Sequence, residues 1–155
     1  MIQSAETLPT WDLSDLYAGV DDPRLEADMQ AGRTRAEAFA QRFKGTIAVV
    51  QLQAGHLRAA LDEYEALLRS QYRPQAFASL LFSTNTQDSA RGALLQKSRE
   101  FGSAVGTLLV FFDLEIGQIP AATYEAVSAS PELAPYRHYL DHQRRLASHN
   151  LSEPE

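Results

Sequence analysis

A stripe of apolar and small residues near the start of the chain restricts the fold more than any other feature of the sequence. Its members follow one another at spacings of four, three, four, three and four: Leu25, Met29, Gly32, Ala36, Phe39 and Phe43. These spacings match the repeat of an α-helix, so the stripe would lie along one helical face. Asp22 can cap the first amides, Pro23 suits the first helical position, and Gly45 is a plausible stop. We therefore expect a helix that buries this face against other helices.

A second helix is expected over residues 55–71. Its predicted apolar face carries five residues: Leu57, Leu61, Tyr64, Leu67 and Leu68. Pro74 then predicts either a kink or a new helix start, because proline lacks an amide hydrogen and crowds the preceding turn. More apolar residues follow this proline: Phe77, Leu80, Leu81 and Phe82. Residues 46–53 are the one β-like run, but no partner strand is evident, so we expect a connector there.

The longest helix is expected over residues 89–116, with Asp88 as its cap. Its apolar stripe is continuous: Leu94, Phe101, Val105, Leu108, Phe112 and Ile116. Gly102 and Gly106 would let another helix approach closely.

Two shorter helices are expected over residues 121–130 and 136–149, with Pro131 and Pro135 between them. Every long periodic segment thus predicts a helix, and the expected fold class is an all-α multi-helix bundle with one long central helix. We expect one helical domain over residues 1–155, with three parts: an N-terminal anchor (1–21), a bundle (22–149) and the start of a further element (150–155).

The segment WDLSDLY at residues 11–17 is expected to pin the N-terminus to this bundle. Asp12 can cap a short helical turn, and Trp11 and Tyr17 are aromatic anchors. A docking peptide for a partner protein is the alternative interpretation.

The composition limits the classes of function. A chain of 155 residues with 45% hydrophobic and 22% charged residues is ordinary for one globular domain. A net charge of −6 argues against a nucleic-acid partner, because phosphate binding needs a basic surface. No apolar run suggests a membrane span and no signal peptide is evident, so we expect a cytoplasmic protein. Zero cysteines exclude disulfides, thiolate zinc sites, iron–sulfur clusters and cysteine nucleophiles.

His138 and His142 lie four residues apart and raise the question of a metal site. Helical zinc peptidases use two such histidines, a glutamate beside the first, and a third protein ligand. Here Tyr139 occupies the position of that glutamate, and Asp141 is on a different part of the helix surface. His56 and His149 offer no second motif. We therefore assign no catalytic, cofactor-binding or metal-binding residue.

The preferred interpretation of this segment is an ordinary packed helix. Four of its residues would face inward: Tyr136, Tyr139, Leu140 and Leu146. Arg144 and Arg145 would be solvated near its C-terminal end, where cations suit the helix dipole.

Glu115 is the second position that carries a functional alternative, because it is a carboxylate on the most apolar helix. It could be a catalytic acid or base, but no second catalytic group lies at an obvious spacing. We favour a structural role in which Glu115 pairs with a basic residue, Arg137 or His138, because an unpaired buried carboxylate is costly.

Four motifs resemble, in order and approximate spacing, the N-terminal helical region of the oligoendopeptidase F family of zinc oligopeptidases. They are WDLSDLYAG (11–19), LLFSTNTQD (80–88), LLVFFDLEI (108–116) and YRHYLDHQRRLASHNLSEPE (136–155). In that family the zinc ion is held by an H-E-x-x-H motif in a catalytic domain, and this chain contains no such motif. LSEPE at residues 151–155 looks like the opening of another helix, so the resemblance suggests part of a larger protein.

The resemblance implies a non-catalytic N-terminal domain that forms one wall of a channel admitting short peptides. Its partners would be the catalytic domain and, as substrates of the whole enzyme, short peptides, with no nucleic acid or membrane. The chain alone would be inactive and hold no cofactor, and an exposed apolar face could make it a homodimer. The alternative is a stand-alone helical module for protein interactions.

Overall fold

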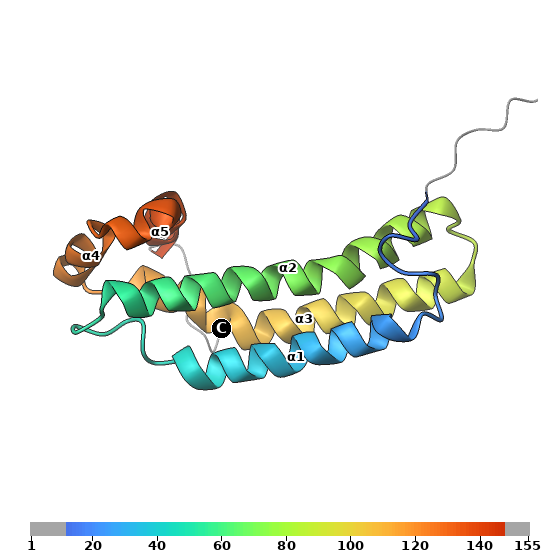
Figure 1. Cartoon of the computed structure of the whole chain (residues 1–155), viewed down its shortest axis with the longest axis horizontal. Helices are drawn as coiled ribbons and strands as arrows, with labels where there is room; N and C mark the ends of the chain where they lie inside the picture. The colour runs from blue at the N-terminus through green and yellow to red at the C-terminus, as the bar shows by residue number, and fades with distance from the viewer. Residues whose placement is uncertain (1–11, 148–155) are drawn as a thin grey trace, which may run out of the picture.

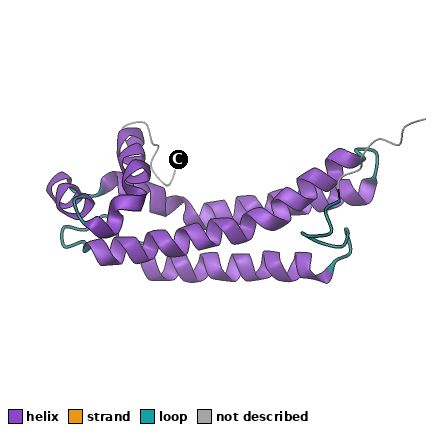
Figure 2. Cartoon of the chain, turned by 45° about the horizontal axis from the view of Figure 1, so that its top comes forward, coloured by secondary structure: helices purple, strands orange, loops and turns teal. Residues whose placement is uncertain are grey.

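The computed structural model describes residues 12–147 and is built of helices (Figure 1). In chain order they are α1 (Pro23–Phe43), α2 (Ala54–Thr84), α3 (Ser89–Gln118), α4 (Ala121–Ser128), the 3₁₀ helix η1 (Pro131–Tyr136) and α5 (Arg137–Leu146). Helices account for 79% of the structure, and no residue within 12–147 lies in a strand (Figure 2). The predicted all-α fold class is confirmed.

The first three helices lie side by side and form an elongated bundle, and each packs against the other two (Figure 1). The shorter elements α4, η1 and α5 gather at one end of this bundle, beside the connector between α1 and α2. The hydroxyl of Thr123 on α4 donates a hydrogen bond to the carbonyl of Val50 in that connector at 3.0 Å. The short α2–α3 connection lies at the opposite end of the molecule.

The α1 helix follows its predicted pattern closely. All positions of the predicted stripe are buried, from Leu25 to Phe43. The carboxylate of Asp22 accepts a hydrogen bond from the amide of Arg24 at 2.9 Å, which confirms the predicted cap. The helix ends at Phe43, and Gly45 has a φ of 80°, a left-handed conformation that glycine adopts at little cost. The predicted connector at 46–53 contains neither helix nor strand.

The α2 helix passes through Pro74 without a break, so the predicted end near residue 71 is wrong. It spans 31 residues and is longer than α3, which has 30. Proline removes one backbone hydrogen bond from a helix interior. Here Pro74 is itself buried, as are Phe77 and Ala78 just after it. Packing against α1 and α3 on both sides of this position offsets the local cost and keeps the helix continuous.

An aromatic cluster joins the three long helices. Its members are Phe39 and Phe43 from α1, Tyr64 from α2, and Phe111 and Phe112 from α3. Phe39 contacts Phe112 edge-on at a centroid distance of 5.2 Å, and Tyr64 lies 4.8 Å from Phe112. Such contacts add to the stabilisation from the apolar area that the rings bury. This cluster forms the part of the core around the C-terminal end of α1.

Some predicted core positions are more exposed than expected. Leu68 and Leu80 of α2 are each 38% exposed, and Leu108 of α3 is only partly buried. Leu109 is buried in place of Leu108. The face that a long helix turns to its neighbours drifts around it with length, so a stripe read at a fixed spacing misses some positions.

Close helix approach uses one of the two predicted glycines and a further one on α1. A Cβ atom at Gly102 would lie 2.6 Å from Nε2 of Gln75 on α2, so the prediction for Gly102 is confirmed. Gly106 has no neighbour within 4 Å of that position, and its predicted contact is absent. Gly32 of α1 instead receives the ring of Phe101, 2.9 Å from where a Cβ would be.

No single helix within residues 12–147 has both the length and the apolar composition needed to cross a membrane. Only α3 and α4 taken together reach those limits, and they are bent by 97° with respect to each other.

Candidate functional site

Residues 12–21 form a strap that lies against α1 and α2 at the end opposite to α4 (Figure 1). Tyr17 holds this strap: it is 1% exposed, its ring packs edge-on against Phe77 at 5.1 Å, and its hydroxyl donates to Asp28 at 2.7 Å. Arg73 of α2 donates to the carbonyl of Leu16 at 2.9 Å. The predicted anchoring role of Tyr17 is confirmed, while Trp11 lies outside the described residues.

Asp12 begins this strap as predicted. Its carboxylate accepts the amide of Ser14 at 3.0 Å, and that hydrogen bond holds the pKa of Asp12 below its usual value. The side chain thus closes a local turn, and its charge is already engaged by a backbone donor.

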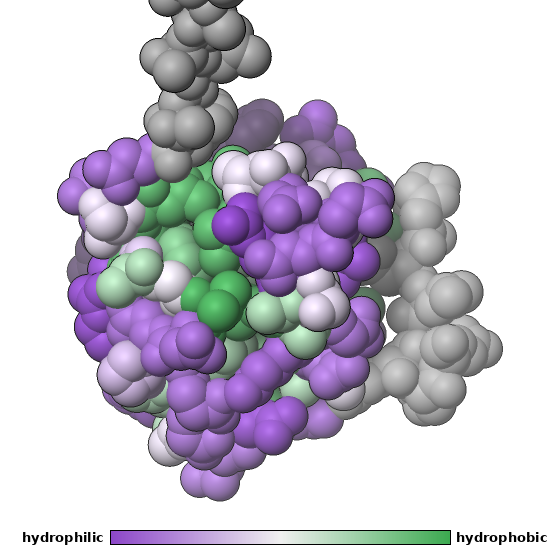
Figure 3. Space-filling model, turned by 90° about the vertical axis from the view of Figure 1, so that its right-hand side faces the viewer, coloured by the Kyte–Doolittle hydropathy of each residue, from purple (hydrophilic) through white to green (hydrophobic). Residues whose placement is uncertain are grey.

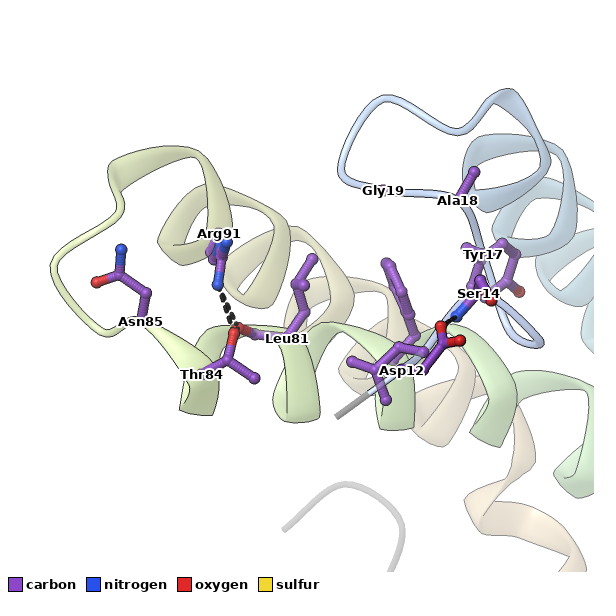
Figure 4. Close-up of a pocket in the computed structure, with 11 residues that line it drawn as sticks. Asp12, Ser14, Tyr17, Ala18, Gly19, Leu81, Thr84, Asn85 and Arg91 are labelled. Atoms are coloured by element: carbon purple, nitrogen blue, oxygen red, sulfur yellow. Dashed lines mark hydrogen bonds between the residues drawn. The ribbon is translucent and has the colours of Figure 1, made fainter. Parts of the chain in front are cut away.

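A groove of ≈ 690 Å³ opens between the strap and the ends of α2 and α3 (Figure 4). Five apolar side chains line it: Leu13, Tyr17, Ala18, Phe77 and Leu81. Figure 3 shows hydrophobic residues gathered at this end of the molecule within a hydrophilic rim. The size is typical of small-molecule pockets, so the chemistry of its polar groups decides what it can do.

The polar groups of this groove are already engaged within the fold. Arg91 forms an ion pair with Asp88 at 3.1 Å and donates to the hydroxyl of Thr84 (Figure 4). No histidine of the described residues lines the groove, so Ser14 and Thr84 have no imidazole base beside them there. The groove offers an apolar surface and, within residues 12–147, no catalytic constellation.

Glu115 has a structural role, but its partners are not those predicted. Its two carboxylate oxygens accept the amide of Gly45 at 2.6 Å and the amide of Ile47 at 3.0 Å. The predicted pairing with Arg137 or His138 is wrong. Glu115 instead fixes the turn that follows α1 and thereby joins the α1–α2 connector to α3. Hydrogen bonds from backbone amides to a carboxylate are charge-assisted, as those from a guanidinium are, so they can supply the donors that a carboxylate needs.

Tyrosine–carboxylate hydrogen bonds join α4, η1 and α5 to the bundle. Tyr139 of α5 donates to Asp113 of α3 at 2.5 Å, and Tyr124 of α4 donates to Asp141 of α5 at 2.5 Å. Burial, followed by these hydrogen bonds, raises the pKa of both hydroxyls far above the ordinary value of tyrosine. Both phenols are therefore neutral donors over the whole physiological range.

The same bonding extends to α2. Tyr136 at the end of η1 donates to Asp62 at 2.7 Å and to Glu65 at 2.8 Å. Tyr64 lies beside Asp113, and burial, together with that carboxylate, raises the pKa of Tyr64 to about 12. The sequence pattern did not predict these pairs because their partners are 17 to 74 residues apart and no local spacing connects them.

His138 and His142 are both exposed on α5, on the side away from the bundle. Within residues 12–147, no three histidine, aspartate or glutamate side chains lie close enough to hold a metal ion together. Asp141, which lies between the two histidines, accepts the Tyr124 hydroxyl. His149 lies outside the described residues, and His56 contacts the hydroxyl of Thr46 at 2.9 Å on another part of the molecule.

The packing of α5 departs in two ways from the prediction. Leu140 is buried and Tyr136 and Tyr139 are partly buried, as expected, but Leu146 is 39% exposed. Arg144 is not free in solvent: it donates to the carbonyl of Ile119 at 2.7 Å, and its guanidinium lies 4.4 Å from the ring centre of Tyr124. These two contacts hold the Arg144 guanidinium in a fixed position beside Tyr124 of α4, where the prediction had it surrounded by solvent.

Comparison with known proteins points to a family for the C-terminal part of the chain. Residues 115–155 match the family model described as Oligopeptidase F, which represents the N-terminal part of peptidase M3 proteins. No curated protein and no solved structure matches the chain. The matched residues begin at Glu115 and, within the described part of the chain, include the end of α3 and all of α4, η1 and α5.

Proposed function

The chain carries an oligopeptidase F-like N-terminal region, and we propose that it serves as the non-catalytic N-terminal domain of a zinc metallopeptidase of that family. In this role its helices form one wall of a channel that admits short peptides. Its partner is a catalytic domain on the other side of the channel, which supplies the zinc ion and the hydrolytic groups.

The observation that carries this proposal is the place of the matched residues in the fold. Within the described part of the chain, the matched elements α4, η1 and α5 form a corner at one end of an elongated bundle (Figure 2). Tyr139, Tyr124 and Tyr136 fix this corner through hydrogen bonds to carboxylates on α3, α5 and α2. A wall must keep its shape when a peptide passes, and hydrogen bonds between elements that are far apart in sequence provide that rigidity.

The residues of this chain do not fit the zinc ion of the family. The two exposed histidines on α5, four residues apart, could supply two zinc ligands. Within residues 12–147, no third histidine, aspartate or glutamate lies close enough to complete the site. We therefore derive no step of peptide hydrolysis from this chain. Its contribution is to bind, orient or exclude peptides.

The test is to isolate the native protein with an antibody raised against the 155-residue chain. We expect the isolated protein to contain zinc and to cleave short quenched fluorescent peptides but not folded proteins, because a channel excludes them. Chelation should abolish the activity and zinc should restore it. A native protein no larger than the 155-residue chain and without peptidase activity would contradict the proposal and favour the stand-alone module.

A further inference from the structure

The outer face of α5 is cationic, although the whole chain has a net charge of −6. We define this face by five exposed residues: Arg137, His138, Asp141, His142 and Arg145. The helix holds three arginines and one aspartate among its ten residues. It is therefore a positive surface on an acidic protein, and it lies within the residues that match the family model.

No carboxylate of the described residues neutralises the arginines of α5. Arg137 donates only to the carbonyl of Ser128 at 3.3 Å, and Arg145 only to the carbonyl of Asp141 at 3.2 Å. By contrast, five arginines of α1, α2 and α3 form ion pairs with described carboxylates, as Arg58 does with Asp62 at 2.8 Å. The guanidinium groups of the outer face therefore keep free donors for an external acceptor.

The acidic residues packed around α5 are occupied by other groups. Tyr139 holds Asp113 of α3, and Tyr124 holds Asp141. Asp62 and Glu65 of α2 share the Tyr136 hydroxyl and form ion pairs with Arg58 and Arg69. These neutral hydroxyls leave the charge of each carboxylate in place but occupy it as an acceptor, and none of these acids forms an ion pair with Arg137 or Arg145.

From this arrangement we infer that the outer face of α5 binds carboxylate groups of acidic peptides. Arginine is suited to this because its planar group can donate two parallel hydrogen bonds to one carboxylate. Arg137 and Arg145 are eight positions apart, which is about 12 Å along a helix. Carboxylates four residues apart on an extended peptide have a similar separation of about 13 Å. The inference rests on the proposed function, since it names the peptides that the channel wall would favour.

The binding test uses the full 155-residue chain and two capped peptides. One carries glutamates four residues apart, and the other has glutamine at the same positions. We expect the glutamate peptide to bind roughly threefold to tenfold more tightly at low salt, and the difference to disappear in high salt. NMR should show shifts in the ring signals of His138 and His142 but not of His56. Equal affinity for both peptides would overturn the inference.

Matched variants locate the binding surface. Arg137→Gln with Arg145→Gln should remove the preference for the glutamate peptide. Arg33→Gln with Arg35→Gln is the control, because it removes the same charge from two exposed arginines of α1 that form no ion pair with a described residue. Loss of the preference in the control as well would mean that net charge, and not the α5 face, attracts the peptide, and would overturn the inference.

Two further measurements separate the possible outcomes. Sedimentation tests whether the α5 face is a dimer interface, and the peptidase activity of the native protein tests the proposed domain role. If sedimentation shows that the α5 double variant dissociates a dimer, the surface binds a second copy of the chain and the peptide inference is wrong. If the native protein cleaves peptides but the chain shows no acidic preference, only the selectivity fails and the proposed domain role stands. If acidic peptides bind but the native protein has no peptidase activity, the proposed function fails while the binding surface remains.

Discussion

Glu115 shows how a single carboxylate can hold two distant parts of the chain together. It accepts backbone amides from Gly45 and Ile47, about 70 residues earlier. Glu115→Gln keeps the shape but removes the charge and one acceptor, so we expect the free energy of unfolding to fall by about 1 to 2 kcal/mol. Urea unfolding followed by circular dichroism measures this change.

The control for this variant is Glu125→Gln on α4, because Glu125 is exposed and its side chain has no hydrogen bond among the described residues. We expect it to change stability by less than about 0.5 kcal/mol. Equal effects of the two substitutions would show that the Glu115 hydrogen bonds contribute nothing to the fold.

Tyr139 is the second residue whose hydroxyl can be tested directly. Tyr139→Phe removes the hydrogen bond to Asp113 and leaves a partly buried carboxylate without that donor, so we expect a loss of about 1 to 3 kcal/mol. Tyr72→Phe is the matched control, since Tyr72 is 70% exposed. If the Tyr139→Phe, Asp113→Asn double variant is as destabilised as the sum of the single variants, the pair is not energetically coupled.

The sequence predicted the hydrogen bonds of a side chain correctly where its partner lies only a few residues away along the chain. Asp22 and Asp88 cap helices through amides two or three residues ahead, as their positions before helical patterns indicate. The pairing of Glu115 was predicted in kind but with the wrong partner, because the α1–α2 connector could not be positioned from spacing. The tyrosine–carboxylate pairs left no signal in the sequence for the same reason.

At the scale of helices, the tyrosine hydroxyls join α2, α3, α4 and α5 and make their docking sensitive to alkaline pH. The pKa of Tyr64 is raised from 10.0 to about 12, and those of Tyr124, Tyr136 and Tyr139 are also raised. The folded protein therefore holds these protons more tightly than the unfolded chain does. The contribution of Tyr64 is complete below about pH 10 and is lost as pH rises through 12.

We expect the free energy of unfolding to be level from neutral pH to about pH 9 and to fall steadily above pH 10. Denaturant melts at a series of pH values measure it, and the phenolate absorbance reports the titration. The Tyr139→Phe variant should show a weaker pH dependence between about pH 10 and 12. A flat profile up to about pH 12 in the parent chain would mean that these hydroxyls are not protected.

Helix positions followed from apolar periodicity, whereas helix lengths did not. Pro74 was predicted to mark a kink or a new helix start, because a proline disfavours a helix interior. The helix continues since Pro74, Phe77 and Ala78 are buried against neighbouring helices, and that tertiary packing outweighs the local preference. A sequence pattern shows the local preference and gives no measure of the packing that opposes it.

For the whole molecule, the all-α bundle was predictable because each long segment carries its own apolar stripe, and capping aspartates mark the starts of α1 and α3. What could not be predicted is how α4, η1 and α5 fold back at one end, since tyrosines and carboxylates distant in sequence fix them there. The proposed function depends on that corner. A family resemblance drawn from motifs was thus supported over residues 115–155, while the roles of particular residues needed the structure.

We expect the 155-residue chain alone not to cleave peptides, even with added zinc. Zinc-dependent hydrolysis needs a metal-bound water of lowered pKa, a base to take its proton, and donors for the developing oxyanion. His138 and His142 could hold zinc only at an exposed helix surface, where water and buffer would complete the coordination. Asp141, the nearest carboxylate in sequence to both, is bound by Tyr124.

The measurement is incubation of the purified chain with zinc and a quenched fluorescent peptide. The double variant His138→Ala, His142→Ala is the control, because it removes both imidazoles and leaves the buried side of α5 unchanged. Turnover that requires zinc and disappears in this variant would assign catalysis to the α5 surface. Absence of turnover in both proteins, together with zinc-dependent cleavage by the native protein, would place the catalytic zinc outside this chain and leave α5 as a surface that peptides contact.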